Sequence, residues 1–168
     1  INFIIGGSNK YFKFNEDTQN KILNDLEFLS ENSSIYVIPS RRTPPEFIKN
    51  LSTLKNHNIK LFSDLFDPIT YGDLLSESNM QIVTWDSISM ISEAISSETG
   101  TFLYEFEEES CPKRYRLFHQ MVKQKGFLKN FSRNMKPYTI SMSSYNSELK
   151  SKILNKIESN LWFKNSVS

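Results

Sequence analysis

The segment Asp86-Ser87-Ile88-Ser89-Met90 has the residue types best suited to chemistry in this sequence. It follows an apolar run over residues 80–84 and precedes a helical pattern, so we expect it to join a buried strand to a helix start. A helix start presents free backbone N–H groups and the positive end of the helix dipole, and serines add hydroxyl donors. The segment therefore predicts an anion site, with Asp86, Ser87, Ser89 and Met90 as its candidate phosphate-binding residues.

Glu93 lies about one turn inside the same predicted helix, on the side of its start. A carboxylate placed there could accept hydrogen bonds from a sugar diol, so the two features together indicate a nucleotide or nucleotide-sugar ligand. A simpler interpretation is that Asp86 or Ser87 only caps the helix and Glu93 is an exposed helix residue. Capping and phosphate binding use the same N–H groups, so both interpretations stay open at this point.

Gly6-Gly7-Ser8 follows the apolar run over residues 3–5 and would let the backbone approach a ligand without side-chain obstruction. The alternative is a plain turn after a strand. The glycines do not form the dinucleotide pattern G-x-G-x-x-G, and the sequence has no P-loop. We treat Gly6, Gly7 and Ser8 as candidate phosphate-binding residues.

Arg41-Arg42 lies between a predicted strand at residues 35–39 and a strong helix start at Thr43-Pro44-Pro45-Glu46. Guanidinium groups there could clamp a diphosphate, and Thr43 is expected to supply the N-cap hydroxyl. Adjacent arginines point in different directions, so one is expected to contact ligand and the other to be structural. The alternative is that both are solvated.

Short apolar runs alternate with helical patterns along the whole chain. Predicted strands cover residues 3–5, 35–39, 59–62, 80–84 and 101–104; predicted helices begin at Asn15 or Asp17 and at Thr43, and cover about 71–76, 87–97, 113–125 and 147–160. This alternation predicts a Rossmann-like α/β fold: a parallel sheet of order 3-2-1-4-5, with room for an extra strand, and helices on both faces. The helix at 113–125 is expected to turn Leu117, Phe118, Met121 and Val122 inward and to end at Gly126.

In this order strands 1 and 4 are neighbours at the switch point, where ligands bind at the carboxyl ends of the strands. The three candidate segments all follow strands 1, 2 and 4. The topology therefore predicts that they surround one crevice.

The composition narrows the class of protein. A length of 168 residues favours one domain, and no run approaches the length of a membrane span. The net charge of +1 gives no overall attraction to DNA or acidic membranes. Cys111 is the one cysteine, so a disulfide framework is excluded and a reducing cytoplasm is expected. His57 and His119 lack ligand spacing, so no metal site is expected.

Residues 111–136 hold eight Lys and Arg and no Asp or Glu, after an acidic run at 105–109. This pattern is typical either of a patch for phosphate, RNA or anionic lipid, or of a solvated helix face balanced by the preceding acids. We favour the solvated face, so no specific nucleic acid is expected. A membrane-peripheral location is the alternative to a purely cytoplasmic one.

The chain starts Ile1-Asn2-Phe3, without Met and inside what reads as a core strand. We therefore expect residues 1–168 to be one Rossmann-like domain, the C-terminal half of a longer two-domain protein. The missing N-terminal domain would be its partner.

Two motifs, Pro39-Ser40-Arg41-Arg42-Thr43-Pro44 and Asp86-Ser87-Ile88-Ser89-Met90-Ile91-Ser92-Glu93-Ala94, resemble the C-terminal half of the mitochondrial fission ELM1-like family. The resemblance covers roughly residues 1 to 132. Bacterial members are often labelled as predicted nucleoside-diphosphate-sugar epimerases, and this chain looks like a bacterial member. The family is in turn similar to GT-B-fold proteins such as UDP-N-acetylglucosamine 2-epimerase, whose C-terminal Rossmann-like domain holds most of the nucleotide.

This resemblance implies a GT-B C-terminal-type domain in which Ser87 and Ser89 contact phosphate and Glu93 holds the ribose. In the epimerase two glycines stand where this chain has Ile88 and Ser89. The implied function is binding of a UDP- or GDP-type nucleotide-sugar in a glycosyltransferase or sugar-nucleotide epimerase, with no other cofactor required. Catalytic residues are not assigned, and this chain alone is expected to bind without turnover. The alternative is a non-catalytic interaction module, because plant members are associated with recruiting a dynamin-like protein.

Overall fold

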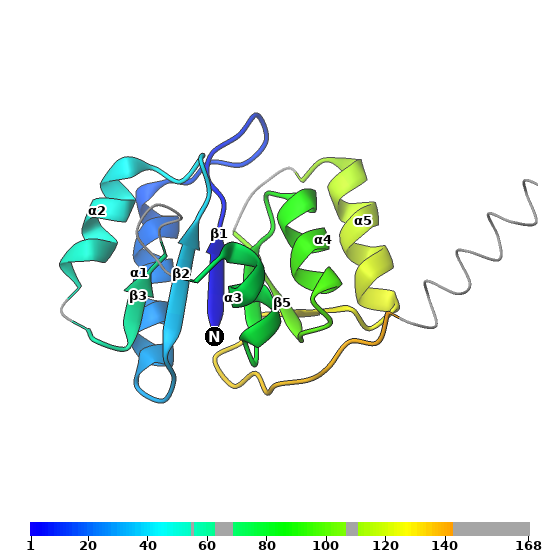
Figure 1. The fold of residues 1–168 in the computed structure, drawn as a ribbon. Coiled ribbons are helices and arrows are strands. Elements are labelled where there is room, and N and C mark those ends of the chain that lie inside the picture. Colours follow the sequence, from blue (N-terminus) through cyan, green and yellow to red (C-terminus); the bar gives the residue numbers. More distant parts are fainter. Residues whose placement is uncertain (55, 63–68, 107–110, 143–168) are drawn as a thin grey trace, which may run out of the picture.

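Six short strands run parallel in one sheet of order β3-β2-β1-β4-β5-β6 (Figure 1). The computed structural model describes residues 1–54, 56–62, 69–106 and 111–142. Its strands are β1 (Asn2–Ile5), β2 (Ile35–Pro39), β3 (Ile59–Leu61), β4 (Gln81–Thr84), β5 (Thr101–Tyr104) and β6 (Leu128–Asn130); its helices are α1 (Glu16–Ser30), α2 (Pro45–Thr53), α3 (Tyr71–Glu77), α4 (Ile88–Ser96) and α5 (Lys113–Gln124). The predicted order is confirmed, and β6 is the extra strand. The predicted helix at about 147–160 lies outside the described residues.

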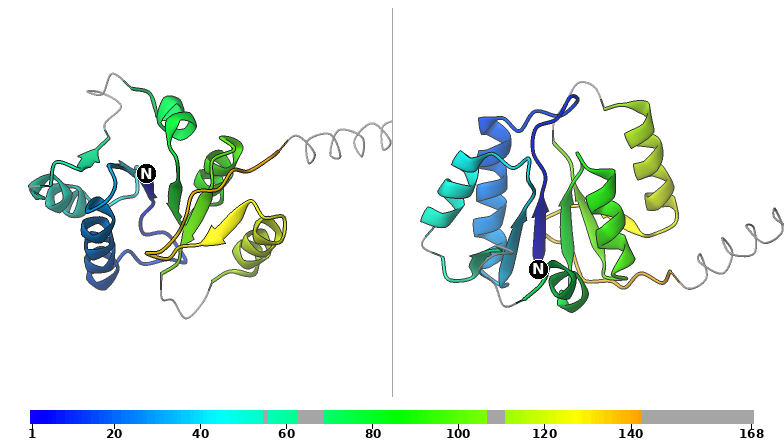
Figure 2. Two further views of the ribbon diagram at one scale, coloured as in Figure 1. Left: turned by 90° about the horizontal axis from the view of Figure 1, so that it is seen from below. Right: turned by 45° about the horizontal axis from the view of Figure 1, so that its top comes forward.

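The two faces of the sheet carry separate apolar cores because side chains alternate along each strand. Phe3 and Ile5 of β1 point to one face, where α1 and α2 pack, whereas Ile4 points to the other face with α3, α4 and α5. In Figure 1, α1 and α2 accordingly lie on one side of β1, and α4 and α5 on the other. Figure 2 shows the same layering from two further directions.

Helix termini follow most of the expected capping chemistry. The Asn15 side chain caps α1 by accepting from the Thr18 backbone, and Gly126 ends α5 with a φ of 76°. The expectation that Thr43 caps the second helix is wrong. The N-cap is Pro44, which has no side-chain capping bond, because the Thr43 hydroxyl is buried against the loop after β1.

The inward face of α5 also differs from the prediction. Leu117 and Met121 are 53% and 44% exposed, and the buried side chains are Tyr115, His119 and Val122. The helical period allows either of two neighbouring stripes, both of which contain Phe118 and Val122, to face the sheet. Tyr115 and His119 lie on the stripe that is buried, so Leu117 and Met121 remain on the exposed side. The predicted strand at 80–84 also begins one residue later, at Gln81.

Strands β1 and β4 are paired in register, with Phe3 opposite Ile82 and Ile4 opposite Val83. The chain leaves β1 toward α1 and β2 on one side and leaves β4 toward α4 and β5 on the other, so the switch point lies between them. The loops after β1, β2 and β4 therefore meet at the carboxyl edge of the sheet, at the top in Figure 1. Among the helices of the described ranges, none combines the length and the apolar character that crossing a membrane requires.

Candidate functional site

A crevice of about 650 Å³ opens at this carboxyl edge. Its walls come from the loop after β1, the loop after β2, the start of α4 and the start of α5. The lining residues are Asn9, Lys10, Tyr11, Arg42, Asp86, Ser87, Ile88, Ser89, Arg114 and Tyr115. The predicted convergence of the three loops is therefore present in the fold, and α5 adds a fourth wall.

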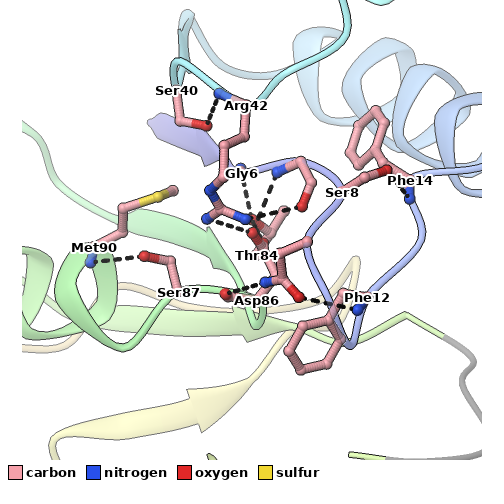
Figure 3. Close-up of polar contacts among 12 residues, drawn as sticks. Gly6, Ser8, Phe12, Phe14, Ser40, Arg42, Thr84, Asp86, Ser87 and Met90 are labelled. Carbon is pink, nitrogen blue, oxygen red and sulfur yellow. Dashed lines mark hydrogen bonds and ion pairs between the residues drawn. The ribbon is translucent and has the colours of Figure 1, made fainter.

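The Asp86 carboxylate is the centre of the polar network between these loops (Figure 3). Its side chain is fully buried, and Oδ2 lies 2.8 Å from Nη2 of Arg42. Oδ2 also accepts from the Gly7 backbone at 3.2 Å, and Oδ1 accepts from the Thr84 hydroxyl at 2.6 Å. A carboxylate that is already surrounded by donors holds the loops together, so this geometry gives Asp86 a structural position.

Close packing of the loops accounts for the two glycines after β1, rather than a need for backbone that a ligand can approach. A Cβ at Gly6 would overlap the Asp86 carboxylate, and a Cβ at Gly7 would overlap the carbonyl of Arg42. The Gly6 N–H donates to the Thr84 hydroxyl at 2.8 Å. Gly6 and Gly7 are buried and do not line the crevice.

The loop after β2 contributes Arg42 to the crevice, whereas Arg41 is exposed and outside the lining. Nη1 of Arg42 donates to the Gly7 carbonyl at 3.0 Å, so both terminal nitrogens have protein partners. The Thr43 hydroxyl lies 2.9 and 2.7 Å from the carbonyl oxygens of Ile5 and Gly6, which ties β2 to β1. Thr43 is thus buried structure and does not face the crevice.

The start of α4 is the segment for which the sequence predicts anion binding. The Ser87 side chain is the N-cap and accepts from the Met90 backbone at 3.4 Å, as the simpler interpretation predicts. The first-turn N–H groups of Ile88 and Ser89 have no intrahelical partner. Ser89 is exposed on the crevice lining, whereas Met90 lies outside it. Ser8 also lies outside, because its hydroxyl accepts from the Phe14 backbone at 2.9 Å.

Glu93 lies one turn beyond Ser89 on the same side of α4, about 6 Å along the helix axis. It is exposed and is not part of the crevice lining. The Tyr71 hydroxyl of α3 donates to its Oε2 at 3.1 Å. Burial and then the neighbouring Glu93 charge raise the pKa of Tyr71, so this phenol remains a donor at neutral pH.

The structure adds crevice residues that the sequence patterns did not single out as a site. The Asn9 amide donates to the Asp86 carbonyl at 3.1 Å and fixes the loop after β1 over the start of α4. Arg114 and Tyr115 of α5 form the fourth wall, and Tyr11 of the loop after β1 packs against them. The one feature of the sequence that indicated this wall was the run of basic residues at 111–136, which includes Arg114.

Aromatic rings underlie this fourth wall. Phe12 packs on Trp85 and Tyr115 with ring centroids 5.0 and 5.2 Å apart, and Trp85 stacks on His119 at 6.3 Å. Burial, followed by the charge of Lys123, lowers the pKa of His119 to about 4, so the imidazole is neutral at physiological pH. The Nε2 atom of His119 is buried without a hydrogen-bond partner among the described residues.

The described residues contain no group of three or more His, Cys, Asp or Glu side chains arranged to hold a metal ion. A second hollow, of about 550 Å³, lies at the amino ends of β1 and β4. None of the described residues that line it is Lys or Arg, whereas the carboxyl-edge crevice has three such residues. An anionic ligand is therefore better matched by the carboxyl-edge crevice.

Comparison with known proteins gives a family match and one informative relative. The family described as Mitochondrial fission ELM1 matches residues 1–153. A Rickettsia prowazekii (strain Madrid E) protein, described as uncharacterized, is 34% identical over 131 residues, which is 73% of this chain and 36% of that protein. The chain thus spans about a third of that relative's length. No solved structure matches.

Proposed function

The chain belongs to the mitochondrial fission ELM1 family, and we propose that its carboxyl-edge crevice binds the diphosphate of a UDP- or GDP-type nucleotide-sugar. The observation that carries the proposal is the junction of three loops at the switch point. There the free N–H groups at the start of α4 and the Ser89 hydroxyl share one crevice with Lys10, Arg42 and Arg114. Asp86 is the acidic residue of the lining, and its charge is balanced by Arg42.

The position of Glu93 supports a nucleotide that extends along α4. A phosphate at Ser87 and Ser89 would leave the ribose about one turn farther on, near Glu93. Tyr71 occupies Oε2 of this carboxylate, and Oε1 has no hydrogen-bond partner among the described residues. Glu93 is thus able to accept from a ribose hydroxyl while Tyr71 holds its orientation.

In a GT-B-like glycosyltransferase or sugar-nucleotide epimerase, this domain would position the nucleotide-sugar and stabilise the diphosphate leaving group. The acid, base and acceptor groups would come from a second domain. The chain alone therefore binds the nucleotide without turnover. Asp86 serves as the residue that positions Arg42.

Isothermal titration calorimetry with UDP, GDP and UDP-sugars tests the proposal. Ser89→Ala is the sharpest variant, because Ser89 is exposed and has no capping role. We expect it to weaken UDP binding by about threefold to tenfold, as for loss of one ordinary hydrogen bond, with no change in thermal stability. Ser96→Ala, at the far end of the same helix, is the matched control. Absence of heat with every nucleotide at millimolar concentration would overturn the proposal.

A second candidate function is a non-catalytic interaction module. It is favoured by two exposed apolar side chains, Leu117 and Met121, which lie one turn apart on α5. Cellular complementation separates the two functions. If Ser89→Ala and Glu93→Ala support function fully while Leu117→Ser with Met121→Gln does not, the interaction module is the correct assignment.

A further inference from the structure

Arg114 is held in the fourth wall of the crevice by two tyrosine rings. Its guanidinium carbon lies 5.1 Å from the ring centroid of Tyr115 and 5.7 Å from that of Tyr11. The two rings contact each other edge to face at 6.1 Å, and Tyr115 is buried against Phe12. Cation–π contacts of this kind restrict a long side chain without using its N–H donors.

Arg114 differs from Arg42, the other arginine of the crevice, in its ion pairing. Among the described residues, ion pairs join Arg42 to Asp86, Lys123 to Glu105 and Arg133 to Asp25, and none involves Arg114. Both terminal nitrogens of Arg42 already have protein partners, 2.8 and 3.0 Å away. An incoming anion would have to share Arg42 with Asp86, whereas no hydrogen bond or ion pair among the described residues occupies the guanidinium donors of Arg114.

We propose that Arg114 binds the second anionic group of the crevice ligand and so makes the site selective for diphosphates over monophosphates. One phosphate lies at the start of α4, on the N–H groups of Ile88 and Ser89, and the other lies against Arg114 on α5. This inference rests on the proposed function and adds to it the residue that recognises the second phosphate. The two rings restrict where the guanidinium lies, and its planar fork of N–H donors is able to bind two phosphate oxygens at once.

The competing interpretation is a solvated arginine that stacks on tyrosines only for packing. That role would contribute to stability and not to ligand choice. The two interpretations therefore differ in one measurable ratio, the affinity for UDP divided by the affinity for UMP.

The test is calorimetric titration of the chain with UDP and with UMP. We expect Arg114→Gln to weaken UDP binding by about tenfold, the usual size for a lost charge-assisted hydrogen bond, and to change UMP binding by less than about threefold. Arg114→Lys should be intermediate, because it keeps the charge but loses the planar fork. Arg116→Gln is the matched control, because Arg116 is exposed on the same helix and does not line the crevice; it should leave both affinities unchanged.

The outcomes separate the two proposals. If the wild-type chain binds UDP and Arg114→Gln binds it equally well, or loses UDP and UMP to the same extent, the role of Arg114 is overturned and nucleotide binding stands. If the wild-type chain binds neither UDP nor GDP, the proposed function is overturned and this inference with it.

Discussion

Nη2 of Arg42 lies 2.8 Å from the buried carboxylate of Asp86, across the junction of three loops. The same carboxylate accepts from the Gly7 backbone and from the Thr84 hydroxyl, and Arg42 donates to the Gly7 carbonyl. These contacts join the loops after β1, β2 and β4 at the switch point of the sheet. The pair therefore gives the crevice its shape before any ligand arrives.

Asp86→Ala should destabilise the chain, because it removes the acceptor for three donors in a buried position. We expect the free energy of unfolding to fall by about 2–4 kcal/mol, less than the ~3–5 kcal/mol for breaking a fully buried ion pair, because the Arg42 side chain is 36% exposed. Urea denaturation measures the change. Glu27→Ala, an exposed acid on α1, is the control and should change stability by less than about 0.5 kcal/mol. A loss for Asp86→Ala as small as that of the control would show that the network does not stabilise the fold.

The glycines after β1 give a second prediction. Gly6→Ala and Gly7→Ala should each lower the free energy of unfolding by more than about 2 kcal/mol, because the new methyl group would overlap Asp86 or the Arg42 backbone. Gly72→Ala, on α3 where a Cβ would approach nothing closer than 3.8 Å, should be neutral or stabilising by up to about 1 kcal/mol. Thermal unfolding of the three variants compares them. Equal stability of all three would contradict the close packing at β1.

The order of the sheet could be predicted because the apolar runs and helical patterns alternate, and right-handed crossovers leave few arrangements. The same reasoning placed Gly6, Arg42 and Asp86 at one edge. It could not assign their roles, because glycine, arginine and aspartate serve equally in ligand sites and in loop packing. The choice between these roles depends on the contact of Arg42 with Asp86, which are 44 positions apart in the chain.

The fourth wall of the crevice shows a different limit of prediction from the sequence. Arg114 reads as one member of a basic helix face, and only the tertiary contact with Tyr11, about a hundred positions earlier, places it in the crevice. The exposed positions of Leu117 and Met121 have the same cause, since the apolar stripe of α5 is wider than the part of it that packs on the sheet. Tyr115 and His119 fill the inner side because Phe12 and Trp85 provide aromatic partners there.

His119 predicts a pH dependence of stability. Its folded-state pKa is about 4, below the ordinary 6.5, chiefly because of burial. Between these two pH values the unfolded chain binds a proton that the folded chain does not, so stability falls as the pH is lowered from 6.5 toward 4. The loss between pH 7 and pH 5 should be on the order of 2 kcal/mol. His119→Leu should remove this part of the loss in urea denaturation at both pH values, whereas the exposed-residue variant His57→Gln should retain it. A wild-type pH dependence in His119→Leu would contradict the prediction.

Two tyrosine hydroxyls that donate to carboxylates give a matched comparison. Tyr104 of β5 donates to the buried Asp25 of α1 at 2.6 Å, while Tyr71 donates to the exposed Glu93 at 3.1 Å. Burial, and then the bond to Asp25, raise the pKa of Tyr104, so it stays a donor well into the alkaline range. Tyr104→Phe should lower the free energy of unfolding by about 1–3 kcal/mol, because Asp25 then keeps one charged partner, Arg133, but loses a buried donor. Tyr71→Phe should cost less than about 0.5 kcal/mol, because water replaces the lost bond at the exposed carboxylate. Urea denaturation of both variants at neutral pH measures the difference, and equal losses would show that burial does not set the strength of these two bonds.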